Sequence, residues 1–224
     1  MLNRVVRGAL PLVAFATFVI TMKTCFRVAR AAGHLDVYDA MGWTPVISFF
    51  GGEDPERFWF HVGFTLLAVL VALTLFLRGR QLRVDRHLEK AWARRGVASV
   101  TAVIAIACLL VMTWVSDGES PIHFIAAVST FFFLSIRELV ETSLVITSTR
   151  ARGFRAWHAV MILWCVACPL ASMFHVYAWI ANEDVRAQYI AVGLQFAFFL
   201  GSIPELARAA PRIDPTTRDA TAPA

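Results

Sequence analysis

Long and nearly uninterrupted apolar segments dominate this sequence, and they constrain its fold more than any other feature. A helix that rises 1.5 Å per residue needs about 20 mostly apolar residues to cross the hydrocarbon core of a bilayer. Six segments approach or exceed this length, at residues 5–25, 58–77, 97–115, 122–146, 157–180 and 189–206. Because lipid offers the backbone no hydrogen-bond partner, each segment is expected to form a helix. The sequence therefore predicts an all-α bundle of six membrane-spanning helices.

The composition agrees with a membrane location. Of the 224 residues, 58% are hydrophobic and only 17% are charged. A water-soluble domain of this length needs more charge to cover its surface. We predict a single six-span membrane domain over residues 1–206 and a short disordered cytoplasmic tail over residues 207–224. The four cysteines lie within or beside apolar segments and are expected to be buried thiols, without a metal or a cofactor.

Lysine and arginine are distributed unevenly among the connecting segments. Fifteen of the 21 basic residues fall in the N-terminus, the loops after the second and fourth segments, and the C-terminal tail. Because cytoplasmic loops are enriched in these residues, we predict that both termini lie in the cytoplasm. The opposite loops are acidic. The net charge of +5 is thus attributed to basic residues on the cytoplasmic side of the membrane, and no nucleic-acid partner is expected.

Three histidines are predicted to share the outer membrane face with most of the carboxylates. His61 lies near the start of the second segment, His123 begins the fourth, and His175 lies near the end of the fifth. Imidazole transfers protons near neutral pH, and carboxylates can orient it. Arg57 shares a helix face with His61 and can bind a phosphate through its planar guanidinium. The alternative is that these side chains only anchor helix ends at the interface.

Charged side chains also occur inside the fourth apolar segment. Arg137, Glu138 and Glu141 lie where charges normally face a bundle interior or a cavity. At 100° per residue, His123, Thr130, Arg137 and Glu141 fall within about 40° of one helix face. This polar stripe predicts either a hydrophilic path for a head group or a proton, or an Arg137–Glu141 pair that braces a helix longer than the bilayer is thick.

Two motifs lie at the outer ends of the predicted helices. Residues 46–60 read VISFFGGEDPERFWF, and residues 113–123 read TWVSDGESPIH. The first resembles the I-S-x-x-G…P-E…F hallmark of the FRAG/DRAM/SFK family of multispanning membrane proteins. Its Gly-Gly-Glu-x-Pro-x-Arg version is closer to the branch that contains post-GPI-attachment-to-proteins factor two. The second motif is similar to the segment that leads into the fourth span in that branch, and Phe174 beside His175 is a looser match.

This resemblance implies a role in remodelling the lipid of GPI anchors, in which a saturated fatty acid is restored to the lyso form. We therefore expect a multi-pass protein of the Golgi or ER membrane, with membrane lipids, GPI-anchored proteins and other membrane proteins as partners. Relatives in the DRAM branch are tied to autophagy and lysosomes, and SFK relatives to lipid organisation at the plasma membrane. A non-catalytic lipid-organising or adaptor role is thus the alternative. Family members often carry an acidic-aromatic pair in the last span, and the comparable place here reads Gln195-Phe196, which argues against direct catalysis.

The leading hypothesis places a lipid-head-group site at the outer ends of the second, fourth and fifth helices. His123 is assigned as the general base, with Glu53 or Glu119 to orient it and His61 nearby. The residues predicted to bind the substrate are Arg57, Gly51, Gly52, Pro55, Glu56 and His175. The two glycines permit backbone conformations closed to other residues, and the proline stiffens the start of the helix. An ion or proton carrier along the polar stripe is a third hypothesis, weakened because charges are seen in only one span.

Overall fold

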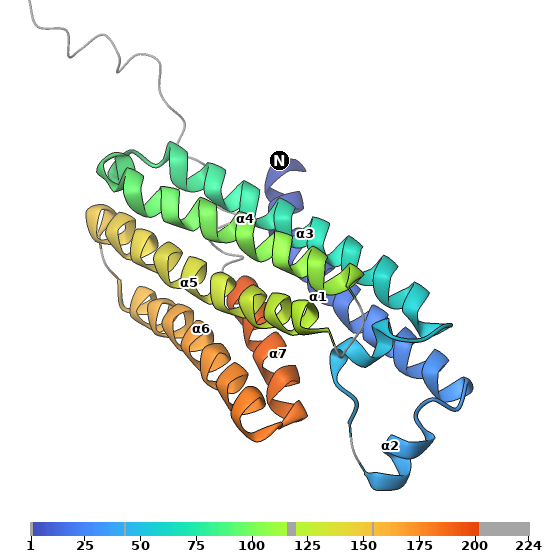
Figure 1. Ribbon diagram of the computed structural model, residues 1–224. Coiled ribbons are helices and arrows are strands. Elements are labelled where there is room, and N and C mark those ends of the chain that lie inside the picture. The colour runs from blue at the N-terminus through green and yellow to red at the C-terminus, as the bar shows by residue number, and fades with distance from the viewer. Residues whose placement is uncertain (1, 43, 116–119, 154, 202–224) are drawn as a thin grey trace, which may run out of the picture.

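The computed structural model describes residues 2–42, 44–115, 120–153 and 155–201, and every regular element in them is helical (Figure 1). The elements are α1 (Leu2–Ala31), α2 (Asp36–Met41), the 3-10 helix η1 (Ile47–Gly51), α3 (Glu56–Val84), the 3-10 helix η2 (Arg86–Ala91), α4 (Trp92–Trp114), α5 (Pro121–Arg152), α6 (Ala156–Asn182) and α7 (Val185–Gly201). The predicted all-α class is confirmed.

Five helical stretches are long and apolar enough to cross a membrane. They are Gly8–Ala31, Glu56–Arg83, His87–Trp114, Pro121–Ala151 and Ala156–Asn182. The apolar helix α7 is shorter, with 17 residues. A sixth span over residues 189–206 stays a prediction, because its last residues lie outside the described part of the chain. The predicted tail over residues 207–224 also lies outside it.

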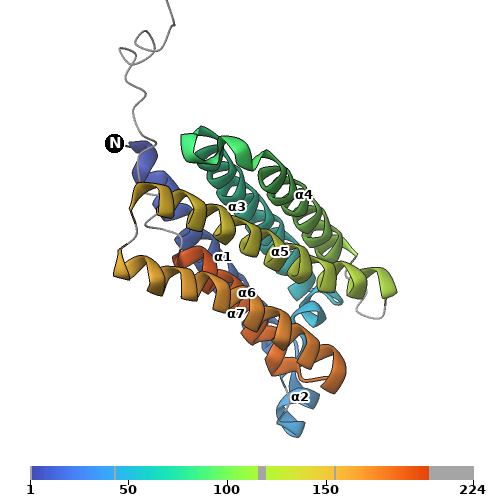
Figure 2. The same ribbon diagram turned by 90° about the vertical axis from the view of Figure 1, so that its left-hand side faces the viewer.

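The long helices form a bundle in which neighbours in sequence are neighbours in space (Figures 1 and 2). Contacts join α1 to α3, α3 to α4, α4 to α5, α5 to α6 and α6 to α7, and α1 also touches α7. We call the end that carries α2 and η1 the outer end, and the end that carries η2 the inner end. These names follow the predicted orientation, which stays a prediction.

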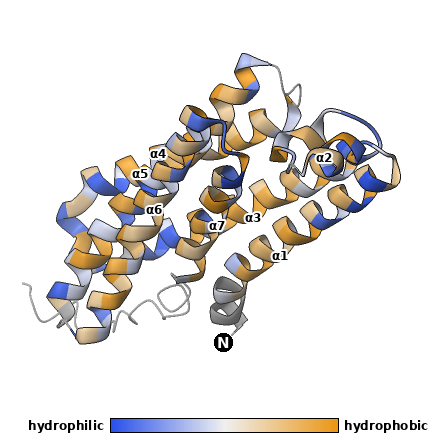
Figure 3. Ribbon diagram, turned by 90° about the horizontal axis from the view of Figure 1, so that it is seen from below, coloured by the Kyte–Doolittle hydropathy of each residue, from blue (hydrophilic) through white to orange (hydrophobic). Residues whose placement is uncertain are grey.

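The surface of the bundle is apolar along the lengths of the helices. Large hydrophobic side chains are strongly exposed on every long helix, and the most exposed include Val103, Val160 and Leu163, at 69–71%. Figure 3 shows hydrophobic colouring along the helices, with most hydrophilic segments toward the two ends. Helices that are hydrophobic all round are typical of membrane spans, because lipid is the solvent for their outer faces.

A cluster of phenylalanines joins α1, α3 and α7 inside the bundle. Phe60 and Phe64 of α3 stack with their ring centroids 4.4 Å apart. Phe18 of α1 lies 6.1 Å from Phe64 and 5.3 Å from Phe196 of α7. Aromatic pairs at these separations contribute about 0.5–1.5 kcal/mol each beyond the area they bury. The cluster therefore fixes the end helices of the chain against α3.

Gly63 of α3 allows the close approach of α1, and its replacement by alanine is expected to destabilise the protein by about 1–3 kcal/mol. A Cβ at position 63 would overlap the side chain of Thr21, which is 7% exposed. Unfolding in mixed micelles measures the effect. Thr21→Gly should restore much of the loss. Gly96→Ala is the matched control, because a Cβ there meets no atom within 4 Å. Equal behaviour of Gly63→Ala and Gly96→Ala would contradict the close packing.

Candidate functional site

The connection between α2 and α3 lies across the outer end of α7. The backbone N–H of Ile47 donates a hydrogen bond of 3.1 Å to the side-chain oxygen of Gln188. The hydroxyl of Tyr189 donates one of 2.9 Å to the carbonyl oxygen of Pro45. Gln188 is only 4% exposed, so its amide is committed to this contact. Two consecutive residues of α7 therefore hold the first hallmark motif in place.

The two glutamates of the hallmark motif bind a histidine from the turn between α1 and α2. Nδ1 of His34 lies 2.7 Å from Oε1 of Glu56, and its Nε2 lies 3.7 Å from Oε2 of Glu53. Glu56 is fully buried, whereas the Glu53 side chain is 68% exposed. The predicted position of these carboxylates beside His61 and His123 is wrong, because both lie at His34 instead. Asp39, five residues after His34, pairs instead with Arg30 at 3.1 Å.

Stability is expected to fall as the pH rises above about 6.5, because of His34. The hydrogen bond to Glu56 raises the pKa of His34, desolvation opposes the shift only in part, and the charges of Glu56 and Glu53 add to it. Because the pKa of His34 is higher in the folded state than in the unfolded state, its protonation stabilises the fold. This stabilisation is complete below the ordinary pKa of about 6.5 and is lost as the pH rises through the folded-state pKa. Melting temperatures across this range test the effect. His34→Gln should flatten the slope, whereas His87→Gln at the inner end should keep it. A wild-type slope in His34→Gln would contradict the assignment.

Arg57 of the motif forms a hydrogen bond within the motif's own loop. The guanidinium of Arg57 donates to the carbonyl oxygen of Gly52, and Pro55 directly precedes α3. Neither Gly51 nor Gly52 has a positive φ, so the expectation that the glycines supply special backbone conformations is wrong. Space is the reason at Gly52, where a Cβ would lie 3.3 Å from the carbonyl oxygen of Phe49.

His123 is held in a single orientation at the start of α5. Its Nδ1 lies 2.7 Å from the carbonyl oxygen of Val115, and the side chain is 4% exposed. A carbonyl only accepts hydrogen bonds, so Nδ1 carries the hydrogen and Nε2 of the neutral ring presents a lone pair. Pro121 in the first turn of α5 is preorganised for a helix start. The Nδ1–H tautomer of His123 leaves Nε2 as an acceptor, which is the atom that a general base uses.

Two spaces meet at His123. The first, which we call the outer vestibule, is open and has a volume of about 760 Å³ between the α2–η1 segment and the α6–α7 connection. The second, which we call the interior cavity, is apolar and narrow, about 80 Å³, and runs among α1, α3, α4, α5 and α7. His123 and Ser48 line both spaces. The two spaces therefore adjoin at these two side chains, one open and carrying charged residues, the other apolar.

The other predicted outer residues do not converge on His123 in the described part of the chain. The ring of His61 packs on that of Trp114 at 4.9 Å, and His175 directs Nδ1 to the carbonyl oxygen of Ala171 in its own helix, at 2.8 Å. Arg57 does not line either space. No described carboxylate pairs with His123, and Glu119 lies outside the described residues. The only described arginine that lines the vestibule is Arg186, beside Glu183 and Asp184.

The polar stripe of α5 is fully buried and joins a cation from α3. Arg137 and Glu141 pair at 2.5 Å, and Glu141 also accepts a hydrogen bond from Arg78. All three are at most 6% exposed. Arg78 directly follows the second apolar segment, which predicts a loop residue, but α3 continues through it to Val84. The premise that only one span carries charge is therefore wrong. The cluster links two helices, as a structural brace would.

Gln195 joins three helices below the interior cavity. Its side-chain nitrogen donates to the hydroxyls of Ser135 in α5 and Ser172 in α6, both at 3.0 Å. Its Oε1 is buried without a hydrogen-bond partner among the described residues, and the side chain lines the cavity. The amide at this position therefore packs the bundle and also presents an acceptor to the apolar space.

The fold and the site together define a multi-pass helical membrane protein with an amphipathic space at one end. The family model of the Frag1/DRAM/Sfk1/Cwh43P N-terminal domain matches residues 7–207, and the chain belongs to this family. No curated protein and no solved structure is significantly similar to the chain.

Proposed function

We propose that the protein binds one membrane lipid at its outer end, with the head group in the outer vestibule and the first carbons of an acyl chain in the interior cavity. The observation that carries this proposal is that a wide space lined in part by Glu183, Asp184 and Arg186 adjoins a narrow apolar space at His123 and Ser48. Sites for small molecules are concave and mostly apolar, with a few placed polar groups. A lipid is the ligand whose own polarity changes along its length in this way.

The head group that fits the vestibule carries both phosphate and amine or hydroxyl groups. Arg186 offers a guanidinium to a phosphate, and Glu183 and Asp184 beside it suit an amine or sugar hydroxyls. A glycosylated phosphoinositol with an amino sugar has this chemistry. The proposal therefore assigns the protein to remodelling of GPI anchors in the Golgi or ER membrane. In this arrangement Arg186 takes the phosphate role that the sequence analysis gave to Arg57.

The proposed chemistry is acyl transfer to a lyso lipid. Nε2 of His123 takes the proton of the free glycerol hydroxyl on the lyso lipid. The oxygen of that hydroxyl attacks the carbonyl carbon of a thioester acyl donor at the same time. The new ester bond forms as the carbon–sulfur bond breaks, and the thiolate that leaves is protonated by the imidazolium. Restoring neutral His123 completes the cycle. Ser48 lies on the same path and is proposed to position the hydroxyl.

A second candidate is a lipid-organising or adaptor protein without catalysis. It is favoured because Glu53 and Glu56 pair with His34, so that no carboxylate among the described residues pairs with His123. Gln195 in place of the acid common in the family points the same way. In that role the vestibule and the cavity bind a lipid and the hallmark loop presents it to a partner.

The test uses the purified full-length protein in liposomes that contain a lyso-GPI and an acyl thioester. Formation of the diacyl lipid, with release of one thiol for each lipid, supports transfer. Saturable binding of the lyso lipid without product supports the adaptor. If the protein neither binds nor converts the lipid, the outer-end site is not a lipid site. In cells that lack the protein, the fatty acids of GPI anchors should stay unremodelled if the first candidate is right.

A further inference from the structure

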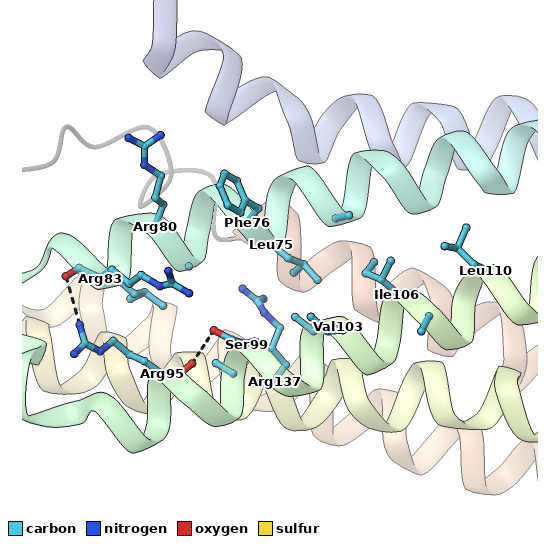
Figure 4. Close-up of a pocket in the computed structure, with 16 residues that line it drawn as sticks. Leu75, Phe76, Arg80, Arg83, Arg95, Ser99, Val103, Ile106, Leu110 and Arg137 are labelled. Carbon is cyan, nitrogen blue, oxygen red and sulfur yellow. Dashed lines mark hydrogen bonds between the residues drawn. The ribbon is translucent and has the colours of Figure 1, made fainter.

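A separate groove lies between α3 and α4 toward the inner end of the bundle (Figure 4). Its volume is about 490 Å³, and small-molecule sites typically measure roughly 300–1,000 Å³. Its membrane part is lined by apolar side chains that include Leu75, Val103 and Leu110. It shares no lining residue with the outer vestibule or the interior cavity. The groove is therefore a second site, and its arginines lie at the opposite end of the molecule from the vestibule.

The inner part of this groove is strongly basic. Arg80, Arg83, Arg95 and Arg137 line it, and no aspartate or glutamate does. Arg137 is balanced by Glu141, but no ion pair among the described residues involves the other three arginines. Figure 4 shows Arg83 and Arg137 extending into the space between the two helices. An uncompensated positive charge thus faces a concave apolar surface.

Arg95 is fixed at the mouth of the groove. Its guanidinium donates to the carbonyl oxygens of Arg83, at 3.4 Å, and of Glu89, at 3.2 Å. Carbonyl oxygens orient a guanidinium without neutralising its charge. The N–H groups that these two bonds leave free are available to an anionic oxygen. Arg83 and Arg95 therefore form a pair of cations, one from each wall of the groove.

Small residues keep the floor of the groove open. A Cβ added at Gly79 would meet no atom within 4 Å, and Ala98, Ala102 and Ala107 line the facing helix. The groove extends along α4 from Arg95 to Leu110, which corresponds to about 22 Å of helix. One leaflet of the hydrocarbon core is roughly 15 Å thick. An acyl chain can thus lie in the groove over the full depth of a leaflet.

We propose that this groove binds one anionic phospholipid of the inner leaflet. Its phosphate lies between Arg83 and Arg95, and one acyl chain passes Gly79 toward Leu110. Charge complementarity selects the head group, and the length of the apolar lining selects a lipid over free phosphate. The apolar lining distinguishes the groove from basic residues that are simply exposed at the inner end of the bundle. Arg150, for example, is exposed at the inner end of α5 and does not line the groove.

Native mass spectrometry of the full-length protein in detergent tests the proposal. Dioleoyl phosphatidate and dioleoyl phosphatidylcholine, which have the same chains, are titrated in parallel. One phosphatidate adduct should persist at concentrations at which phosphatidylcholine does not bind. Each arginine near an anionic lipid contributes roughly five-fold in affinity, so Arg83→Gln with Arg95→Gln should weaken phosphatidate binding more than ten-fold. Arg150→Gln removes the same kind of charge outside the groove and should leave binding unchanged.

A charge-neutral variant tests the apolar half of the site. Gly79→Leu fills the floor and should weaken phosphatidate binding at least ten-fold, while it leaves the arginines in place. Helix propensity favours this change, and Ala107→Phe on the facing wall replaces it if the protein is not recovered. Equal losses in Arg150→Gln and the double variant would overturn the proposal, because a diffuse basic surface would explain both. Unchanged binding in the groove-filling variant, or full displacement by millimolar inorganic phosphate, would also overturn it.

Discussion

Glu141→Gln is expected to lower the free energy of unfolding by about 3–5 kcal/mol, the range seen when one partner of a buried ion pair is removed. Glu141 is 1% exposed and binds Arg78 from α3 and Arg137 from its own helix. The neutral amide leaves two buried guanidiniums without their shared anion. Titration with SDS in mixed micelles measures the loss. The effect should be large because it separates α3 from α5 as well as weakening α5.

Glu138 provides a matched control on the same helix. It is also fully buried, but neither of its carboxylate oxygens has a hydrogen-bond partner among the described residues. Glu138→Gln should therefore lower stability by at most about 1 kcal/mol. Comparable losses in the two variants would show that total charge, and not the contacts of Glu141, holds the cluster together. If Glu141→Gln leaves the free energy of unfolding nearly unchanged, the cluster does not brace the bundle.

His123→Asn is expected to lower the rate of acyl transfer by roughly 10²–10⁴-fold, the usual contribution of a general base. The asparagine amide can still donate to the carbonyl oxygen of Val115, so the start of α5 keeps its hydrogen bond. It has no atom that replaces the lone pair of Nε2. The measurement is product formation in liposomes at saturating lyso lipid. Binding of the lyso lipid should change little.

The same variant distinguishes the two proposed functions. If the protein is an adaptor, His123→Asn should support normal GPI anchors in cells, because the shape of the site is kept. His175→Asn is the control, since His175 bonds within its own helix and lines neither space. A retained rate in the purified His123→Asn protein would exclude His123 as the base. Loss of lyso-lipid binding in it would instead assign the residue to recognition.

The apolar segments predicted the helices well, because lipid imposes a single solution on the backbone. Every predicted span overlaps a helix, and the helices extend past the apolar limits, as α3 does by continuing through Arg78 to Val84. A hydropathy pattern ends at the first charge, whereas the helix ends where its hydrogen bonds do. Helical register offered a way to find Arg78. It lies three residues after Leu75 and seven after Val71, both of which are buried, so it belongs to the same inward face.

The partners within the site were harder to predict. The motif marked Glu53, Glu56 and Arg57, but only the packing of α1 against α3 brings His34 to the two glutamates. Nothing in the sequence links His34 to Glu56, 22 positions further on, across the helix α2 and the 3-10 helix η1. The same holds for Ser48 and His123, which line the same two spaces through the fold of a connecting loop. Which side chains meet at the helix ends depends on tertiary packing, and the periodicity of one segment carries no information about that packing.

The packing of each helix on its neighbour in sequence also bears on how the protein is made. Mostly local contacts favour rapid assembly, so each helix can dock on the previous one as it leaves the ribosome and enters the membrane. The contact of Phe15 and Phe18 with Phe196 is different, because it joins the first helix to the last. Gln188, Gln195 and Phe196, all from α7, complete the wall of the interior cavity. The interior cavity is therefore completed only when synthesis reaches α7, whereas the groove between α3 and α4 needs no residue of α7 and can bind its lipid earlier.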